Sequence, residues 1–340
     1  MELFLLQLHS ITMSNLSSAV GMEVTEKHAE HAPHHSESDS DIFSSFFTYG
    51  RPLVWIFGTI NNAIAFAVFS RKSMRGSLNS FLFRCLALLE FLLVQEHIES
   101  VFALGGIDLT ALHVWSCRII YWIVLAAQLV AVWVLVAIGV ERVVAVVFPH
   151  LAKSWCTVKK GKVYVAILSI GSLALNIPYL IYITTTHLYV PAYGRVVTNC
   201  NMPTSGDPFL MQLLAIIPLI HAILYSSLPF IVLLLLNLII IIGLCRVQQQ
   251  RATMHAEGTT TKSTLTGMTS MLISVSVVFL ILTTPYSVFI IFAIAQGRLI
   301  VNLLYISYIL QALNHSINLW LYCLTGTKFR KEFIAMIQCK

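Results

Sequence analysis

The sequence contains few charged residues. Asp, Glu, Lys and Arg together make up 11% of its 340 residues, less than half of the roughly 25% that is usual in soluble domains. Hydrophobic residues make up 57% of the chain. This composition excludes an ordinary water-soluble domain, and it places the chain in or on a membrane.

Long stretches of the chain lack charge completely. Six uncharged windows are long enough to cross a bilayer, which needs about 18 or more apolar residues: 52–70, 119–140, 163–186, 208–245, 263–297 and 299–327. A seventh apolar run, 81–104, contains one arginine and three glutamates. Because the runs are continuously apolar and do not alternate with a period of two, we expect helices and not barrel strands. The sequence predicts an all-α membrane protein, a bundle of seven transmembrane helices.

The distribution of Lys and Arg predicts the orientation of the bundle. Numbered in chain order, with 81–104 as the second, the loops after the first, third and fifth predicted helices and the C-terminal segment contain 14 of the 21 basic residues, whereas the opposite side has five. By the positive-inside rule, the N-terminus is extracellular and the protein is a multi-pass protein of the plasma membrane, in contact with lipid. We expect a disordered extracellular tail (1–49), the seven-helix domain (50–324), and an amphipathic cytosolic helix with a short tail (325–340).

The tail and the cysteines carry further signals. Asn15 begins a glycosylation sequon in the tail, whose acidic, His- and Ser-rich stretch 23–41 is typical of disorder, not of a metal site.

Of the seven cysteines, Cys117 and Cys200 are the two on the predicted outer side, where thiols are oxidised, so we expect them to form a disulfide. Cys339 follows a basic amphipathic stretch and is equally an acylation site or an idle cysteine.

One predicted helix carries both Cys117 and, 25 positions later, Arg142. At 1.5 Å per residue this interval spans about 38 Å, slightly more than the bilayer core. The outer end of the helix therefore carries a disulfide cysteine, and its inner end carries the pair Glu141 and Arg142. That pair can neutralise itself, or the arginine can reach a partner.

The order of motifs resembles that of the rhodopsin-like (class A) G-protein-coupled receptors. The matching segments are GTINNAIAF with Asn62, SMRGSLNSFLFRCLALLEF with Glu90, Cys117, ERVVAVVFP with Glu141 and Arg142, the prolines Pro178, Pro229 and Pro285, INLWLY with Asn318 and Tyr322, and GTKFRKEF. The stretch LPFIVLLLLNLIII and the loop THLYVPAYGRVVTNC, with two β-prone runs around a turn, are similar to invertebrate FMRFamide-type neuropeptide receptors.

The resemblance implies a receptor that binds an extracellular ligand, a neuropeptide in this branch, and activates a heterotrimeric G protein through Glu141 and Arg142. It implies no catalysis, no cofactor, no metal and no binding of nucleic acid. Val124 stands where amine receptors have an aspartate, and Ala312 where opsins have the retinal lysine, so neither ligand is expected. A non-peptide chemosensory ligand or signalling without a G protein remains an alternative. A transporter is a remote alternative, because the chain shows no internal repeat.

The chain also departs from the family pattern at several positions. Thr283 replaces a tryptophan in the sixth helix, Asn237 replaces a tyrosine in the fifth, and Leu319 replaces the proline of the NPxxY motif. No acid stands near Leu265 to pair with Arg142. We expect the inactive state to be weakly restrained as a result.

Candidate ligand contacts lie toward the predicted outer ends of the helices. Glu96 and Glu99 could receive a cationic group such as an arginine-amide terminus. Each of the remaining candidates could equally serve packing: Gln128, His221, Tyr225, Tyr286, Tyr305, Tyr308 and Gln311.

A second polar set lies at the middle of the predicted bundle: Asn62, Glu90, Asn314, Asn318 and Tyr322. The last three are four residues apart and share one helical face. A carboxylate at Glu90 costs at least ~2.5 kcal/mol unless it is paired or protonated. The set is therefore either an ion- or proton-sensitive switch or a group of interhelical hydrogen bonds. Sodium fits poorly, because Glu90 is longer than the usual aspartate and Ala131 replaces a serine that helps to bind sodium in relatives.

Overall fold

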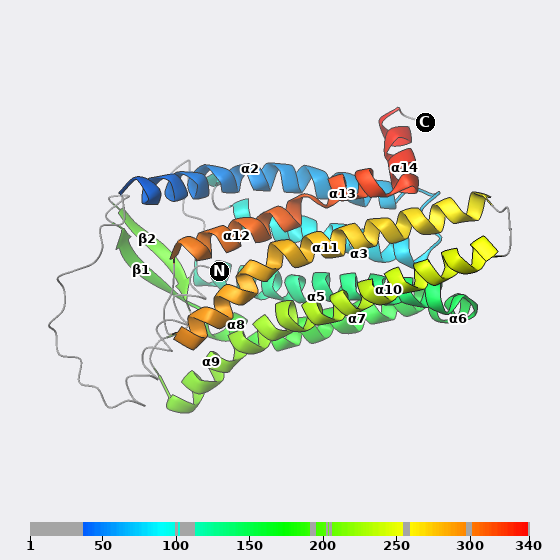
Figure 1. Ribbon diagram of the computed structural model, residues 1–340. Helices are drawn as coiled ribbons and strands as arrows, with labels where there is room; N and C mark the ends of the chain where they lie inside the picture. The colour runs from blue at the N-terminus through cyan, green and yellow to red at the C-terminus, as the bar shows by residue number, and fades with distance from the viewer. Residues whose placement is uncertain are drawn as a thin grey trace.

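A computed structural model describes residues 37–98, 101–102, 113–190, 195–201, 203, 206–253, 259–296 and 301–338. The chain order of its elements is α2 (Glu37–Phe69), α3 (Leu78–Val94), η1 (Gln95–His97), α5 (Val114–Val147), α6 (Pro149–Trp155), α7 (Val158–Leu175), α8 (Ile177–Tyr182), β1 (Thr184–Val190), β2 (Arg195–Asn201), α9 (Pro208–Ala222), η3 (Ile223–Ser227), α10 (Leu228–Thr253), α11 (Thr259–Gln296), α12 (Val301–Ser316), α13 (Asn318–Thr325) and α14 (Thr327–Ile337). These helices account for the seven predicted spans and for the short C-terminal helix (Figure 1).

Several of the spans are interrupted. Within the described residues, six helices are long and apolar enough to cross a membrane by themselves. The seventh predicted span is divided at Ile317 into α12 and α13, of 16 and 8 residues, so that neither piece alone has the length of a transmembrane helix. Pro178 and Pro229 mark the breaks of the fourth and fifth spans, because a proline ring removes a backbone donor.

The first helix begins earlier than the sequence led us to expect. α2 starts at Glu37, well inside the segment 1–49 that we expected to be a disordered tail. The local sequence ESDSDIFSSFF explains this start, because acids favour the first turns of a helix and its apolar residues recur four apart. Averaging the composition over residues 23–41 hid this local signal. Residues 1–36, with the predicted sequon at Asn15, lie outside the described residues.

Polar side chains cap the starts of α3, α7 and α9. Ser77 accepts a hydrogen bond from the Ser80 N–H at the start of α3, and Thr157 caps α7 in the same way. Asp207 accepts from two backbone N–H groups in the first turn of α9. Each side chain satisfies a donor that the first turn of a helix leaves without a partner.

The third span, α5, is the central element of the bundle. In its most apolar window 67% of the residues are buried, compared with 17% for the fourth span, whose Ile167 and Ile170 point outward. α7 nevertheless approaches α3 closely at Gly161, where a Cβ atom would lie 2.3 Å from Leu78 Cδ1. The exposed apolar side chains of the outer helices suit contact with lipid.

The two ends of the bundle differ in their accessory elements (Figure 1). At one end β1 and β2 form an antiparallel hairpin, with Thr185 paired to Cys200, as the loop sequence predicts. At the opposite end α14 turns away from the bundle. These are called the hairpin end and the α14 end below.

Candidate functional site

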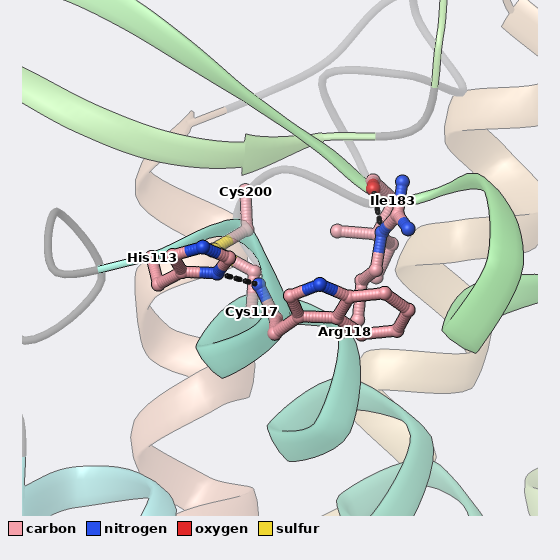
Figure 2. Close-up of a disulfide and its surroundings, with 6 residues drawn as sticks. His113, Cys117, Arg118, Ile183 and Cys200 are labelled. Atoms are coloured by element: carbon pink, nitrogen blue, oxygen red, sulfur yellow. Dashed lines mark hydrogen bonds between the residues drawn. A yellow bond between two sulfur atoms is a disulfide. The ribbon is translucent and has the colours of Figure 1, made fainter.

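A disulfide joins the hairpin to the central helix. The Cα atoms of Cys117 and Cys200 lie 5.7 Å apart, within the usual range for a disulfide, and the predicted bond is confirmed. Figure 2 shows this bond beside His113, which caps α5, and Arg118. Arg118 Nε donates to the Ile183 carbonyl at 2.8 Å, directly before β1. The hairpin is thus fastened to α5 by one covalent and one polar contact.

A small polar group lies at the hairpin end, between η1 and α12. The Tyr308 hydroxyl donates to Glu96 Oε1 at 3.0 Å and lies 3.1 Å from His97 Nδ1. Because the hydroxyl has a single proton, His97 Nδ1–H is the donor in the second bond. The guanidinium of Arg51 lies over the Tyr308 ring, 5.6 Å from its centroid. Glu96 is partly exposed, whereas His97 and Tyr308 are buried. The group presents an accessible carboxylate among aromatic side chains.

Three of the other pocket candidates lie deeper and bond between helices. Gln311 Nε2 donates to the Tyr225 hydroxyl at 2.8 Å, which joins the seventh span to the fifth across the bundle. His221 Nε2 lies 3.2 Å from the Leu125 carbonyl of α5. Thr283, which replaces the family's tryptophan and is not one of these candidates, donates from Oγ1 to a carbonyl of its own helix at 2.7 Å. Tyr225 and Gln311 therefore provide one of the buried polar contacts between spans.

The remaining pocket candidates are less informative. Gln128 and Tyr286 are buried. Glu99 lies outside the described residues, as does Cys339, and for Tyr305 the structure describes the helical backbone alone.

Two tryptophans of α5 bind carbonyl groups at the interruptions of neighbouring spans. In the π-helical turn Ile223–Ser227, each carbonyl accepts a hydrogen bond from the N–H five residues later. For the Leu224 carbonyl this residue is Pro229, which has no N–H to donate. Trp133 Nε1 donates to this carbonyl at 3.1 Å. Trp122 Nε1 donates at 2.8 Å to a carbonyl in the last turn of α7. α5 thus satisfies backbone groups that the broken helices leave open.

Glu90 and His315 form a buried ion pair at the middle of the bundle. Glu90 Oε2 of α3 contacts His315 Nδ1 of α12, and the two residues are 5% and 6% exposed. A small cavity of about 10 Å³ lies beside them and has room for about one water molecule. It is lined by Leu86, Glu90, Gln128, Ala131, Val132, Leu135, Tyr225, Val275, Phe279, Asn314, His315 and Asn318. The predicted polar residues Glu90, Asn314 and Asn318 therefore meet there.

Asn62, the other asparagine of the predicted polar set, contacts the backbone of the seventh span. Asn62 Nδ2 donates to the His315 carbonyl at 2.8 Å, and its neighbour Asn61 donates to the Ser316 carbonyl at 2.9 Å. These two carbonyls lie immediately before the break at Ile317. The break is present although Leu319 occupies the place of the family's proline, and the first span binds the two carbonyls that a continuous helix would use internally.

Tyr322 belongs to an aromatic cluster at the α14 end. Its ring packs edge-on against Phe69 and Phe83, with centroids 5.3 and 5.4 Å apart, and against Phe329 of α14. Tyr322 is fully buried. The cluster joins the first, second and seventh spans to α14.

Arg142 is held by its neighbour in sequence. Its Nε and Nη2 donate to the two carboxylate oxygens of Glu141, at 2.6 and 3.0 Å, and Asn79 Nδ2 of α3 donates to the same carboxylate at 3.1 Å. The pair thus neutralises itself, one of the two possibilities raised by the sequence. The described residues give Arg142 no acidic partner on α11. Cys156, in the segment between α6 and α7, feels the same charges: burial, and then the Glu141 carboxylate, raise the pKa of its thiol.

Comparison with known proteins identifies the family. The family model described as 7 transmembrane receptor (rhodopsin family) matches residues 60–322, most of the chain. The chain belongs to the rhodopsin family of seven-transmembrane receptors. It is therefore a multi-pass membrane receptor, and not an enzyme.

The curated relatives in this family have names that refer to peptides. The chain is 25% identical over 292 residues to the FMRFamide receptor of Drosophila melanogaster, covering 83% of this chain and 52% of the relative. It is 31% identical over 131 residues to the FMRFamide peptide receptor frpr-18 of Caenorhabditis elegans, covering 36% and 29%. Sex peptide receptor-related protein 2 of C. elegans is 24% identical, with 84% and 70% covered. The chain thus spans about half the length of the Drosophila FMRFamide receptor, and the resemblance inferred from its motifs is confirmed.

Sequence reasoning missed some partners within this rhodopsin-family bundle. His315 was not among the residues predicted for the polar set, although it binds Glu90 directly. The available signal was that it is the one titratable side chain among residues 309–321. The bonds made by Asn61, Asn79 and Trp133 had no comparable signal, because each depends on how neighbouring helices are rotated.

Proposed function

We propose that the chain is a plasma-membrane receptor with an extracellular N-terminus, which binds a basic peptide at the hairpin end and activates a heterotrimeric G protein at the α14 end. The names of the relatives support a peptide, since FMRFamide contains an arginine and an amidated terminus. The basic loops at the α14 end support the orientation.

One observation carries the ligand half of this proposal: the partly exposed carboxylate of Glu96, which accepts from Tyr308 beside the Arg51 guanidinium. Carboxylate and aromatic faces both attract cations. Arg51 shows that the place accommodates a guanidinium, and an arginine of a peptide would meet the same chemistry. The aromatic side chains around it would pack against the apolar residues of such a peptide.

A peptide screen with calcium and cAMP readouts tests the ligand half, using a library that includes peptides with a C-terminal arginine-aromatic-amide sequence. Against the best peptide, Glu96→Gln with Glu99→Gln should lower potency about 5- to 150-fold, the loss expected for charge-assisted hydrogen bonds worth about 1–3 kcal/mol. Glu332→Gln at the α14 end is the control and should leave potency unchanged. An unchanged response in the double variant would remove these glutamates from the ligand site.

Arg142 carries the second half of the proposal. It is 5% exposed, and its ion-pair partner is the residue beside it, so no charged contact with α11 has to break when the α14 end opens. A gap of a few kcal/mol between the two states leaves the active one populated at about 0.1 to 10%. We therefore expect measurable signalling without ligand.

Arg142→Ala, compared with wild type at equal surface expression, tests this half. Signalling without ligand should disappear in the variant, whereas Glu141→Gln, which frees the arginine, should increase it. A silent wild type together with a normal agonist response of Arg142→Ala would show that signalling does not pass through this residue.

A further inference from the structure

The buried pair of Glu90 and His315 differs from the other ion pairs among the described residues. Arg142 bonds its neighbour, and Arg71 bonds Glu332 in a partly exposed place, with side chains 29% and 19% exposed. Glu90 and His315 come from different helices and are buried at the centre of the bundle. Their contact therefore joins the second span to the seventh in a place largely shielded from bulk water, where charges are screened little.

The number of protons on this pair follows from its surroundings. Of the residues that line the adjacent cavity, Glu90, His315 and Tyr225 can titrate, and the phenol of Tyr225 is neutral at physiological pH. With one proton shared between carboxylate and imidazole, the pair has no net charge. Removing that proton leaves a buried anion, and adding another leaves a buried cation, and both are costly in a medium of low polarity. We expect the pair to hold a single proton.

The cavity is a poor site for a sodium ion from solution. Hard cations require oxygen ligands, and Ala131 offers a methyl group where a hydroxyl would be needed. The carboxylate of Glu90 already faces a positively charged imidazole, which would repel a second cation. Asn314 and Asn318 offer neutral amide oxygens, which could bind a cation but cannot offset its repulsion by the imidazolium. These residues do not fit sodium.

We propose that His315 is the built-in counter-cation of Glu90, so that the polar core needs no cation from solution and does not respond to Na⁺. The imidazolium takes the position that a bound ion would have, and it is delivered by the chain itself. Removing the imidazole should then uncover a lone carboxylate beside a cavity the size of one water molecule. A monovalent cation could enter that space, with Asn314 and Asn318 as neutral oxygen ligands.

Thermal unfolding of the purified full chain in detergent tests this, because the measurement needs neither agonist nor G protein. Wild type should melt at the same temperature in NaCl and in N-methyl-D-glucamine chloride at about 150 mM. His315→Ser should melt lower in N-methyl-D-glucamine, and NaCl should raise its melting temperature by about 2–4 °C. His315→Asn serves if the serine variant does not fold. Adding Glu90→Gln to either variant should abolish the response to Na⁺.

His221→Ser is the matched control, because His221 is also a buried histidine but bonds a carbonyl of α5, not a carboxylate. It should be destabilised without gaining a response to Na⁺. A wild-type chain stabilised by NaCl over N-methyl-D-glucamine would overturn the proposal. So would folded His315 variants that melt at the same temperature in both salts.

Discussion

At the hairpin end a covalent bond and polar contacts run from one span to another, whereas at the α14 end the buried Arg142 bonds its neighbour in sequence, the Arg71–Glu332 pair is partly exposed, and aromatic rings fill the space between helices. The disulfide, the Arg118 contact with Ile183 and the Tyr308 contact with Glu96 all join different elements. At the α14 end Arg142 bonds Glu141. Packing is easier to rearrange than a covalent bond, so we expect the α14 end to move when the receptor changes state.

The largest effect should come from removing the covalent contact. Cys117→Ser releases a link between residues 83 positions apart, which should destabilise the folded chain by about 4–5 kcal/mol on the chain-entropy model. Flow cytometry of tagged receptor should show strongly reduced surface expression. Cys245→Ser, at an exposed free cysteine of α10, is the control. Normal expression of Cys117→Ser would mean that the hairpin end is held mainly by its polar contacts.

The next effect concerns the centre of the bundle, between the two ends. Trp133→Phe keeps an aromatic ring but removes the donor to the Leu224 carbonyl beside Pro229. An unsatisfied buried acceptor costs about 1–3 kcal/mol, so the melting temperature should fall by several degrees. Trp320→Phe, at a side chain that is 61% exposed, should change it little. Equal melting of both variants would show that the carbonyl finds another partner.

A smaller effect is expected at the ion pair of Arg71 and Glu332, which joins the segment between α2 and α3 to α14 with N and O atoms 2.9 Å apart. Partly exposed pairs contribute about 0–1 kcal/mol and weaken with salt. Arg71→Ala should therefore lower the melting temperature by at most a degree or two. A loss as large as that of Trp133→Phe would contradict the view that aromatic packing holds this end.

The smallest effect reports on the charges around Arg142. Burial and the Glu141 carboxylate raise the pKa of the Cys156 thiol, so Glu141→Gln should lower that pKa and increase the fraction of thiolate at a given pH. With the other free cysteines replaced, alkylation of Cys156 near neutral pH should become faster by up to about threefold. The difference should disappear at high pH, where the thiol is ionised in both proteins. Equal alkylation rates of the two proteins near neutral pH would show that the Glu141 carboxylate does not affect the Cys156 thiol.

The sequence predicted the bundle because apolar length and charge distribution are properties of single helices. The windows without charge, the hairpin runs and the pairing of Cys117 with Cys200 all appear in the structure. The start of α2 at Glu37 was missed because composition was averaged over a longer segment. Local spacing of apolar residues carries that information, whereas mean composition does not.

The site was predicted less completely, because contacts between helices depend on how each helix is rotated. The spacing of Asn314, Asn318 and Tyr322 placed them on one face of the seventh span, but it could not show which faced α3. Asn314 and Asn318 line the cavity with Glu90, whereas Tyr322 packs in the aromatic cluster. That His315 supplies the partner of Glu90 depends on a rotation that one sequence does not specify.

The break of the seventh span at Ile317 exists without a proline at position 319. A proline at position 319 would lack the N–H that a continuous helix needs, but Leu319 has one, and so has Trp320. The Trp320 N–H bonds the Ile317 carbonyl at 3.0 Å, while the Ser316 carbonyl, its acceptor in a continuous helix, receives Asn61 instead. The hydrogen bonds of Asn61 and Asn62 therefore couple the position of the first span to the break in the seventh.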